Sequence, residues 1–334
     1  MPYKARLKTG LPRKCKKTQY KVANWTKYNK SLKKRGALSL YFPKGDLKSI
    51  FYNETPYVEG ISGRAAEYNV AYIQLIYTFY RLFDWGLRQM TGYFEDLWTS
   101  KGLDIPVPSF GTLSDSFACV PVEVKQFCNQ LVTRLQRGEK ISLIVDSTGF
   151  NFPRARAWFE KTYGEACTQK PWRKIHLSID PEMNTHAIEV TEQTISDQKI
   201  MENLIPEDLK PMLEKLLGDG GYYDHEKSQA LLDQGIIPVI PPPKTAVVHG
   251  KETTTWHDLI VSYIKEKGSI YAFHKKYGYG LRALVEAHFS RIKRCIGSTF
   301  KTIKIESQQR EAITTANILN LWNSFGKPVS VKIG

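Results

Sequence analysis

The sequence lacks the features of membrane and exported proteins. No apolar stretch is long enough to cross a bilayer, because the best candidate, residues 68–83, is interrupted by Asn69, Gln74 and Arg81. The N-terminus has no apolar region of the kind found in signal peptides, and continues from Lys4 into further basic residues. We therefore expect a protein of the cytoplasm or the nucleoid, with no membrane partner.

Cysteine is also scarce. The five cysteines are an odd number, widely scattered, and contain no C-x-x-C pair, which argues against both a disulfide framework and a zinc site. An apolar content of 42% in 334 residues is nevertheless enough for a substantial core, in one large domain or two ordinary ones. The cysteines are Cys15, Cys119, Cys128, Cys167 and Cys295.

Acidic residues are absent from residues 1–45, which contain fourteen Lys or Arg and so carry +14 of the formal net charge of +15. The rest of the chain is nearly neutral, with 34 basic and 33 acidic residues. A basic segment interspersed with aromatic residues such as Tyr20 and Trp25 can neutralise DNA phosphates and release counterions. A solubilising tail is the alternative, but blocks of like charge usually serve as interaction arms. We predict a basic, partly flexible arm over residues 1–60.

The next part of the chain, residues 61–138, is predicted to be helical and is assigned to DNA binding. Apolar residues recur at helical spacing over 83–97 and again over 121–135. Residues 106–116 could begin a recognition helix capped by Ser109, but the loop before them is long for a helix-turn-helix. Plain helical packing is an equally good interpretation of that segment.

From residue 139 to residue 334 the pattern changes to alternating strands and helices. The apolar run 141–145 predicts a central strand, buried on both faces, that ends at Asp146. Alternating residues predict two hairpin-like partners. The order β-β-β-α-β-α-β-α is that of a ribonuclease-H-like α/β fold with a mixed sheet. The later elements are predicted at 172–179, 186–191, a helix from Asp197, 213–217, a helix capped by Asp224, and 236–240.

Two aspartates follow predicted strands. Asp146 begins an Asp-Ser-Thr-Gly segment, and Asp219 lies in Gly-Asp-Gly-Gly, whose glycines permit a tight backbone path and close approach of a ligand. If the first and fourth strands are neighbours, both carboxylates project from adjacent positions. Hard oxygen ligands of this kind suit Mg²⁺ or Mn²⁺ and suit zinc poorly. Either aspartate alone is more often a turn or cap residue.

A third acidic residue lies on a predicted helix with three other polar residues. At 3.6 residues per turn their spacing places all four within an arc of about 60°. One interpretation is a solvated helix face with a weak i,i+4 ion pair. The other is a carboxylate that completes a metal site, flanked by a cation and a hydroxyl that hold phosphates. The four residues are Tyr279, Arg282, Glu286 and Lys293.

This Tyr-Arg-Glu-Lys spacing resembles the signature of DDE transposases of insertion-sequence families four and five, and it matches at every defined position. Four further segments are similar to family-five blocks, in the right order, and the resemblance extends over about residues 60–325. The segments are 146–149, 172–176, 218–222 and 289–293.

The resemblance implies that Asp146, Asp219 and Glu286 hold two divalent ions, Mg²⁺ or Mn²⁺. One ion would activate water or a 3′-hydroxyl, and the other would stabilise the leaving 3′ oxygen. The implied partners are terminal inverted repeats, target DNA and a second copy of the chain on DNA. The implied DNA contacts are Tyr279, Arg282, Arg291 and Lys293.

The chain departs from family four in one respect, because only residues 244–278 separate the last predicted strand from the glutamate helix. A large β-rich insertion is therefore absent, which leaves hairpin chemistry open. Trp172, Trp256 and His176 are predicted to be structural. Two other functions stay open: a metal-dependent nuclease on the same fold, and a repressor or domesticated transposase that binds DNA without cutting it.

Overall fold

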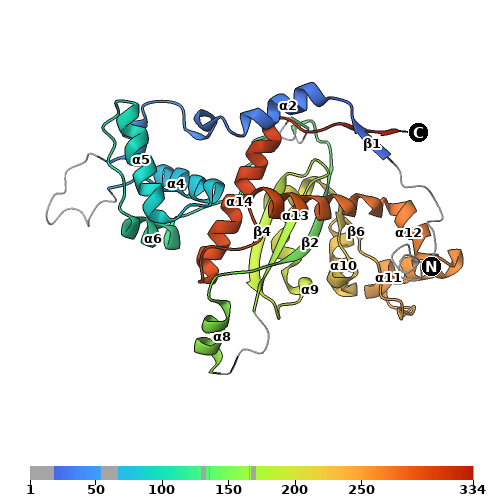
Figure 1. Ribbon diagram of the computed structural model, residues 1–334. Coiled ribbons are helices and arrows are strands. Elements are labelled where there is room, and N and C mark those ends of the chain that lie inside the picture. The colour runs from blue at the N-terminus through green and yellow to red at the C-terminus, as the bar shows by residue number, and fades with distance from the viewer. Residues whose placement is uncertain are drawn as a thin grey trace, which may run out of the picture. The chain divides into compact units, whose positions relative to one another are not determined.

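The computed structural model describes residues 19–53, 67–128, 133–134, 136–164, 166 and 171–333 (Figure 1). The chain divides into two compact units. One contains both chain ends, Met1–Leu40 with Phe325–Gly334, and the other contains Tyr41–Ser324. In the described part of the chain, no helix is both long and apolar enough to span a membrane.

The larger unit is built on a five-stranded mixed sheet in the order β4-β3-β2-β5-β6. The first three strands in the chain pair antiparallel, and β5 and β6 then join β2 in parallel. The predicted arrangement of the strands is confirmed, including the adjacency of the first and fourth strands, but a helix that was not predicted, over Ala155–Tyr163, lies between the first two strands of the chain. The strands are β2 (Ile141–Phe150), β3 (Arg173–Ile179), β4 (Thr185–Glu192), β5 (Leu213–Leu217) and β6 (Ile237–Val239).

Strand β2 does not end at Asp146, as the sequence predicted, but continues to Phe150. Its parallel pairing with β5 stops at Ile144 and Leu217, whereas its antiparallel pairing with β3 continues through Asp146 to the end of the strand. The Ser-Thr-Gly segment after Asp146 resembles a turn in the sequence. It stays extended because β3 still supplies backbone hydrogen-bond partners on one side.

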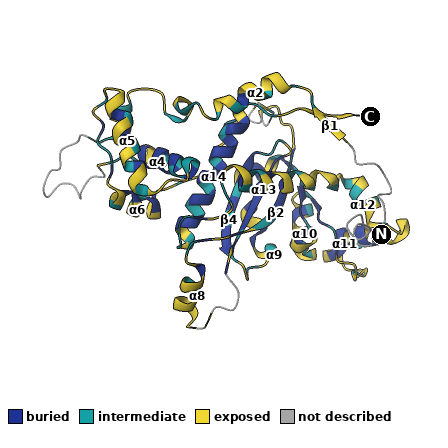
Figure 2. Cartoon of the chain, viewed as in Figure 1, coloured by how far each residue is buried: buried dark blue, intermediate teal, exposed yellow. Residues whose placement is uncertain are grey.

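Helices cover the sheet. On one face, an apolar cluster that includes Leu143, Val145, Met201 and Leu231 buries the sheet under α9, α10 and the 3-10 turns between them (Figure 2). Because side chains alternate along a strand, Asp146 faces the other way, and α13 contacts β2. The helices are α8 (Ala155–Tyr163), α9 (Asp197–Ile200), α10 (His225–Asp233), α11 (Thr255–Lys267), α12 (Ile270–Tyr277), α13 (Ala283–Cys295) and α14 (Ile305–Phe325). The 3-10 turns are η2 (Glu202–Leu204), η3 (Glu207–Met212), η4 (Gly220–Tyr222), η5 (Glu252–Thr254) and η6 (Tyr279–Arg282).

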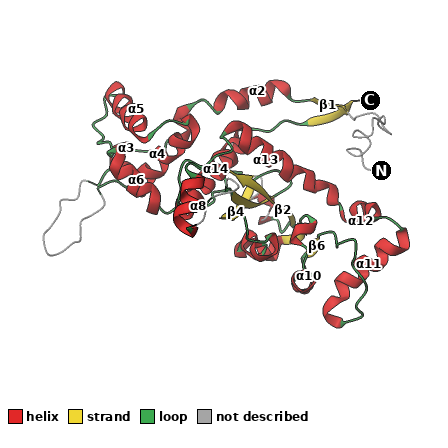
Figure 3. Ribbon diagram, turned by 60° about the horizontal axis from the view of Figure 1, so that its bottom comes forward, coloured by secondary structure: helices red, strands yellow, loops and turns green. Residues whose placement is uncertain are grey.

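The helices that precede the sheet lie together (Figure 3), and many aromatic rings pack among them. Ring stacking joins Phe51 to Tyr72 and Tyr77 to Phe117, with centroids 4.7 and 4.1 Å apart. The periodic run 83–97 is not one helix, because Asp84 adopts a left-handed conformation and separates two helices. The elements are η1 (Leu38–Tyr41), α3 (Leu47–Phe51), α4 (Val70–Phe83), α5 (Leu87–Ser100) and α6 (Phe110–Cys119).

Two predicted helix caps are confirmed. The Ser109 side chain accepts a hydrogen bond from the backbone N–H of Thr112 at the start of α6. The Asp224 side chain likewise accepts from the backbone N–H of Lys227 at the start of α10. Each cap satisfies a backbone donor that has no partner within its helix.

The helix predicted to begin at Pro121 is wrong for residues 121–128, which have no regular secondary structure. Side chains of α14 bind the backbone there instead. Asn317 accepts from the Lys125 N–H at 2.7 Å and donates to the Glu123 carbonyl at 2.8 Å, and Asn320 donates to the Lys125 carbonyl at 3.0 Å. The second half of the predicted helix lies partly outside the described residues.

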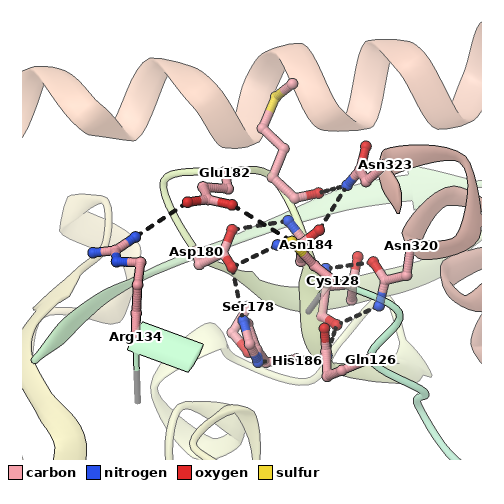
Figure 4. A network of polar contacts seen from close by, with 12 residues as sticks. Gln126, Cys128, Arg134, Ser178, Asp180, Glu182, Asn184, His186, Asn320 and Asn323 are labelled. Atoms are coloured by element: carbon pink, nitrogen blue, oxygen red, sulfur yellow. Dashed lines mark hydrogen bonds and ion pairs between the residues drawn. The ribbon is translucent and has the colours of Figure 1, made fainter. Parts of the chain in front are cut away.

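The β3–β4 turn is fixed to α14 by buried polar contacts (Figure 4). Asp180 accepts hydrogen bonds from the backbone and side chain of Asn184 and lies 3.2 Å from His186 Nε2. Burial raises the pKa of Asp180, but hydrogen bonds from His186 and Asn184 outweigh burial and hold it below its usual value. Asn323 on α14 then donates to Asn184 at 3.0 Å. Asp180 is therefore ionised at neutral pH, and its hydrogen bonds hold the turn in place.

The smaller unit is a short antiparallel ribbon with a helix. It consists of β1 (Gln19–Val22), α2 (Trp25–Lys34) and β7 (Ser330–Ile333), with Gln19 opposite Ile333 and Val22 opposite Ser330. The predicted arm over residues 1–60 lies partly outside the described residues, and its described part also contains η1 and α3. The pairing with the last strand was not predicted.

Candidate active site

Asp146 and Asp219 lie at matching positions on neighbouring strands. The last paired residues of β2 and β5 are Ile144 and Leu217, and each aspartate follows its paired residue by two positions. Backbone donors orient both side chains: Ser147 N–H donates to Asp146 at 2.9 Å, and Gly221 N–H donates to Asp219 at 2.8 Å. The parallel pairing therefore brings the two carboxylates to one edge of the sheet, as the sequence predicted.

Glu286 reaches this edge from the first turn of α13. The four polar residues predicted on one α-helix are in fact divided between two elements, because Tyr279 and Arg282 belong to the 3-10 turn η6 and the α-helix begins at Ala283. Gly278, with φ of 75°, ends α12 in a left-handed conformation that favours glycine and starts this tighter turn.

Arg282 contacts all three predicted carboxylates. One guanidinium nitrogen lies 2.9 Å from Asp146 and 3.8 Å from Asp219, and the other lies 2.7 Å from Glu286. The side chains of Asp146, Asp219 and Glu286 are 11%, 39% and 62% exposed. The triad is thus assembled around one cation, with Asp146 at its buried end and Glu286 facing solvent.

Burial raises the pKa of the Asp146 carboxyl to about 6, although Arg282 and the Ser147 N–H both act to lower it. For Arg282, burial lowers the pKa, but the combined effect of Asp146, Tyr279, Glu286 and Asp219 outweighs burial and the pKa is raised overall. The guanidinium therefore stays charged, and it offsets part of the repulsion among the clustered carboxylates.

The donor chemistry of this cluster fits a divalent cation. Three carboxylates supply only oxygen ligands, which Mg²⁺ and Mn²⁺ prefer. Within the described ranges, however, no three or more His, Cys, Asp or Glu side chains converge closely enough to hold a metal ion. Arg282 lies among the carboxylates and supplies the positive charge there. The residues thus suit a metal centre, while their spacing suits a guanidinium.

Lys293 and Tyr279 lie beside the triad. The Lys293 ammonium donates to the Thr148 hydroxyl at 2.7 Å, and burial lowers its pKa. Thr148 is two residues beyond Asp146 on β2, so this lysine is positioned next to the carboxylate edge. Tyr279 stacks on His274 with ring centroids 4.3 Å apart, and burial raises the pKa of its hydroxyl.

Arg291, the fourth predicted DNA contact, lies elsewhere on α13. It is five residues beyond Glu286, which corresponds to about 140° around the helix. Its guanidinium donates to Asn323 of α14 at 2.6 Å. The structure therefore places Arg291 against α14, and its role in DNA binding stays a prediction.

A buried polar cluster next to Asp219 was not predicted. His176 contacts Thr191 at 2.9 Å, Asp197 at 3.3 Å and Tyr222 at 3.4 Å. Burial lowers the pKa of His176 to about 4, against the opposing effect of Asp197. His176 is fully buried and structural, as predicted, but the sequence assigned Asp197 only to the start of a helix.

Gly221 explains how close Asp197 lies to the active-site turn. A Cβ at this glycine would lie 2.9 Å from an Asp219 oxygen and 3.1 Å from an Asp197 oxygen. Only glycine leaves room for both carboxylates around this backbone. The Gly-Gly pair after Asp219 was the available sequence signal for such a close approach.

Both tryptophans considered in the sequence have structural contacts. Trp172 covers Gly149, where a Cβ would lie 3.0 Å from its ring. Trp256 is 8% exposed, and its indole N–H donates to the Pro238 carbonyl at 3.1 Å. A base-stacking role for Trp256 would require unpacking it.

Two family models match the chain, and both are described as a transposase DDE domain. One matches residues 137–321, more than half of the chain, and includes the whole sheet and all three carboxylates. The other matches residues 33–154, which contain the helices α3 to α6 and Asp146. The mixed sheet agrees with the ribonuclease-H-like fold of such domains. The chain therefore belongs to the DDE transposase family.

Proposed function

We propose that this protein is the transposase of an insertion sequence of the families four and five group. It binds the terminal inverted repeats of its element, cleaves DNA to expose 3′-hydroxyls and joins them to target DNA. The observation that supports this most directly is the convergence of Asp146, Asp219 and Glu286 around Arg282. Three carboxylates from two strands and a helix have little structural reason to cluster unless they act together.

In this proposal Asp146, Asp219 and Glu286 hold two Mg²⁺ or Mn²⁺ ions. When bound, such ions activate a water or 3′-hydroxyl nucleophile and stabilise the leaving oxygen of an in-line phosphoryl transfer. Asp146 is buried away from bulk water. In this less polar environment its negative charge interacts more strongly with nearby charges than it would in water. Gly221 N–H and Ser147 N–H fix the orientation of the two aspartates.

The basic side chains then position DNA. Arg282, once released from the carboxylates, and Lys293 would contact phosphates on either side of the cleaved bond, together with the hydroxyl of Tyr279. Arg291 would contact the backbone farther along the duplex. The helices of residues 61–138 and the basic arm would hold the DNA ends, and two copies of the chain would bring both ends together.

A strand-transfer assay tests this function. Purified protein with Mg²⁺ or Mn²⁺ is incubated with DNA that carries the inverted repeats flanking its own gene, and cleaved and joined strands are mapped. We expect joined product that disappears in Glu286→Gln. Cleavage without joining would instead identify a nuclease on the same fold, and binding without cleavage would identify a repressor or a domesticated derivative.

A further inference from the structure

The net positive charge of the protein is confined to the unit formed by the two chain ends. Met1–Leu40 and Phe325–Gly334 together contain fifteen Lys or Arg and no Asp or Glu. Tyr41–Ser324 contains 33 basic and 33 acidic residues, so its formal charge is zero. The unit of the chain ends, with no acidic residue, thus carries the entire formal charge of +15.

The C-terminal segment is fixed in this unit by specific contacts. The Asn24 side chain donates to the Lys327 carbonyl at 2.9 Å and accepts from the Val329 N–H at 2.7 Å. Ala23 N–H donates to the Val329 carbonyl at 2.7 Å, and the β1–β7 ladder begins one residue farther on. One asparagine therefore fixes the start of β7 through both a donor and an acceptor.

Gly326 allows the C-terminal segment to lie close to α2. Its φ of 137° is a conformation that favours glycine, and a Cβ there would lie 3.1 Å from the Cβ of Ser31 on α2. Ser31 is buried, and its hydroxyl lies 3.3 Å from the Gly326 carbonyl. The C-terminal segment is thus packed against α2 as well as paired with β1.

Both α2 and the β1–β7 ribbon have exposed residues (Figure 2), and several of these residues are lysines. Four lysines of α2 are exposed, and at 100° per residue they span an arc of about 120°. On the ribbon, Lys332 of β7 lies opposite Tyr20 of β1, so both side chains are on one face. Tyr20 is 66% exposed, and Trp25 is 58% exposed. The four lysines of α2 are Lys27, Lys30, Lys33 and Lys34.

We propose that the two chain ends fold together into a single unit that binds the DNA sugar-phosphate backbone, and that β7 is a required half of it. The proposal rests on the proposed function, because it takes DNA as the substrate. Lysines without acidic neighbours neutralise phosphates and release counterions regardless of base sequence. An isolated two-stranded ribbon is marginally stable. Loss of β7 therefore removes both Lys332 and the partner that keeps Lys21 of β1 extended.

The experiment distinguishes the effect of pairing β7 with β1 from the effect of the charge that β7 carries. Binding of the full-length protein to a duplex of unrelated sequence is measured by fluorescence anisotropy over a range of KCl concentrations. Asn24→Ala removes the side-chain hydrogen bonds that hold the C-terminal segment and leaves all fifteen positive charges unchanged. Lys332→Gln removes one charge and leaves the seating contacts in place. Lys265→Gln is the matched control, because Lys265 is an exposed lysine of α11 in Tyr41–Ser324, the part of the chain with no formal charge.

Each lost phosphate contact lowers the slope of log Kobs against log[salt] by about 0.9. We expect Lys332→Gln to lower the slope by about 0.9, and Asn24→Ala by about 1.8, since Lys21 and Lys332 both lose their place. Lys332→Gln added to Asn24→Ala should have no further effect. Gly326→Ala should reproduce Asn24→Ala, and the control should match the wild type.

An Asn24→Ala protein with a wild-type slope, in which hydrogen exchange shows that β7 is released, would overturn the proposal. So would a Lys265→Gln effect as large as that of Lys332→Gln. Strand cleavage is assayed in parallel on short DNA at low salt. If the variants show the expected changes in slope but the wild-type protein never cleaves DNA, the proposed function is contradicted and this inference still holds.

Discussion

The guanidinium of Arg282 lies 2.9 Å from the carboxylate of Asp146, and it also contacts Glu286, which follows Arg282 by four residues in the chain. One cation thus connects an acidic residue of the sheet to an acidic residue of α13. Both contacts hold the carboxylates together, and both must loosen if the same oxygens are to bind metal ions. If the proposed metal ions bind these carboxylates, Arg282 competes with them directly for the same oxygens.

Arg282→Ala should raise Mn²⁺ affinity, on the order of tenfold, because the ions no longer displace a guanidinium. In EDTA, the free energy of unfolding of the same variant should be lower than that of the wild type by about 2 kcal/mol. The variant loses hydrogen bonds to charged partners, and the carboxylates repel one another. Calorimetric titration with Mn²⁺ and urea unfolding measure the two effects. Arg282→Lys, which keeps the charge, should fall between the variant and the wild type. Equal Mn²⁺ affinity in all three proteins would contradict the competition.

Alanine substitution of any of the three acidic residues should abolish strand cleavage and leave DNA binding intact. Asp146→Ala, Asp219→Ala and Glu286→Ala each remove proposed oxygen ligands, whereas the lysines proposed to hold phosphates are unchanged. Cleavage is followed on end-labelled DNA and binding by anisotropy. Loss of binding together with cleavage would mean that the carboxylate cluster is needed for folding instead.

The stability of the protein should fall in acid, in part because of His176. Its pKa is lowered to about 4 by burial, from an ordinary value of 6.5, so between these values the unfolded chain binds a proton that the folded chain does not. Stability from this group is complete above pH 6.5 and is lost as pH falls toward 4. The loss between pH 7 and pH 4.5 is about 2 to 3 kcal/mol. His176→Gln should show a flatter fall in unfolding free energy over this interval, and parallel curves would refute the assignment.

The ion pair of Arg81 and Glu311 should be worth more to stability than any exposed pair. Both side chains are nearly inaccessible, at 2% and 0% exposure, and lie 2.5 Å apart between α4 and α14. Arg81→Met should cost about 3–5 kcal/mol, because it leaves a buried carboxylate uncompensated. Adding Glu311→Gln should recover part of this loss. Urea unfolding of the single and double variants measures it, and a double variant less stable than the single one would show that Glu311 acts through other partners.

Local rules predicted much of the fold and of the site. Ser109 and Asp224 cap helices because each residue satisfies backbone donors within its own turn, which requires no knowledge of the tertiary structure. The strands around Asp146 and Asp219 followed from short apolar runs, and their adjacency followed from the order of elements. The convergence of Asp146, Asp219 and Glu286 could therefore be predicted from residue types, spacing and a family resemblance.

Several of the errors involve partners distant in sequence. Strand β2 passes Asp146 because β3 continues to pair with it, and residues 121–128 stay irregular because Asn317 and Asn320 bind their backbone. The position of Arg282 among three carboxylates depends on the exact start of α13. Periodicity describes one segment at a time, so it contains no information about a hydrogen bond supplied by another segment.

The pairing of β1 with β7 also bears on when the protein becomes complete during its synthesis. Asn24 and Val329 are 305 residues apart in the chain. At about 5–20 residues per second, the ribosome makes Val329 roughly 15–60 s after Asn24. A nascent chain therefore exposes its N-terminal lysines long before β1 has a partner, whereas each helix of Tyr41–Ser324 forms from residues made together. The pairing of β1 with β7 can therefore form only after Val329 has been made, and a product terminated before that residue would carry most of the positive charge without this pairing.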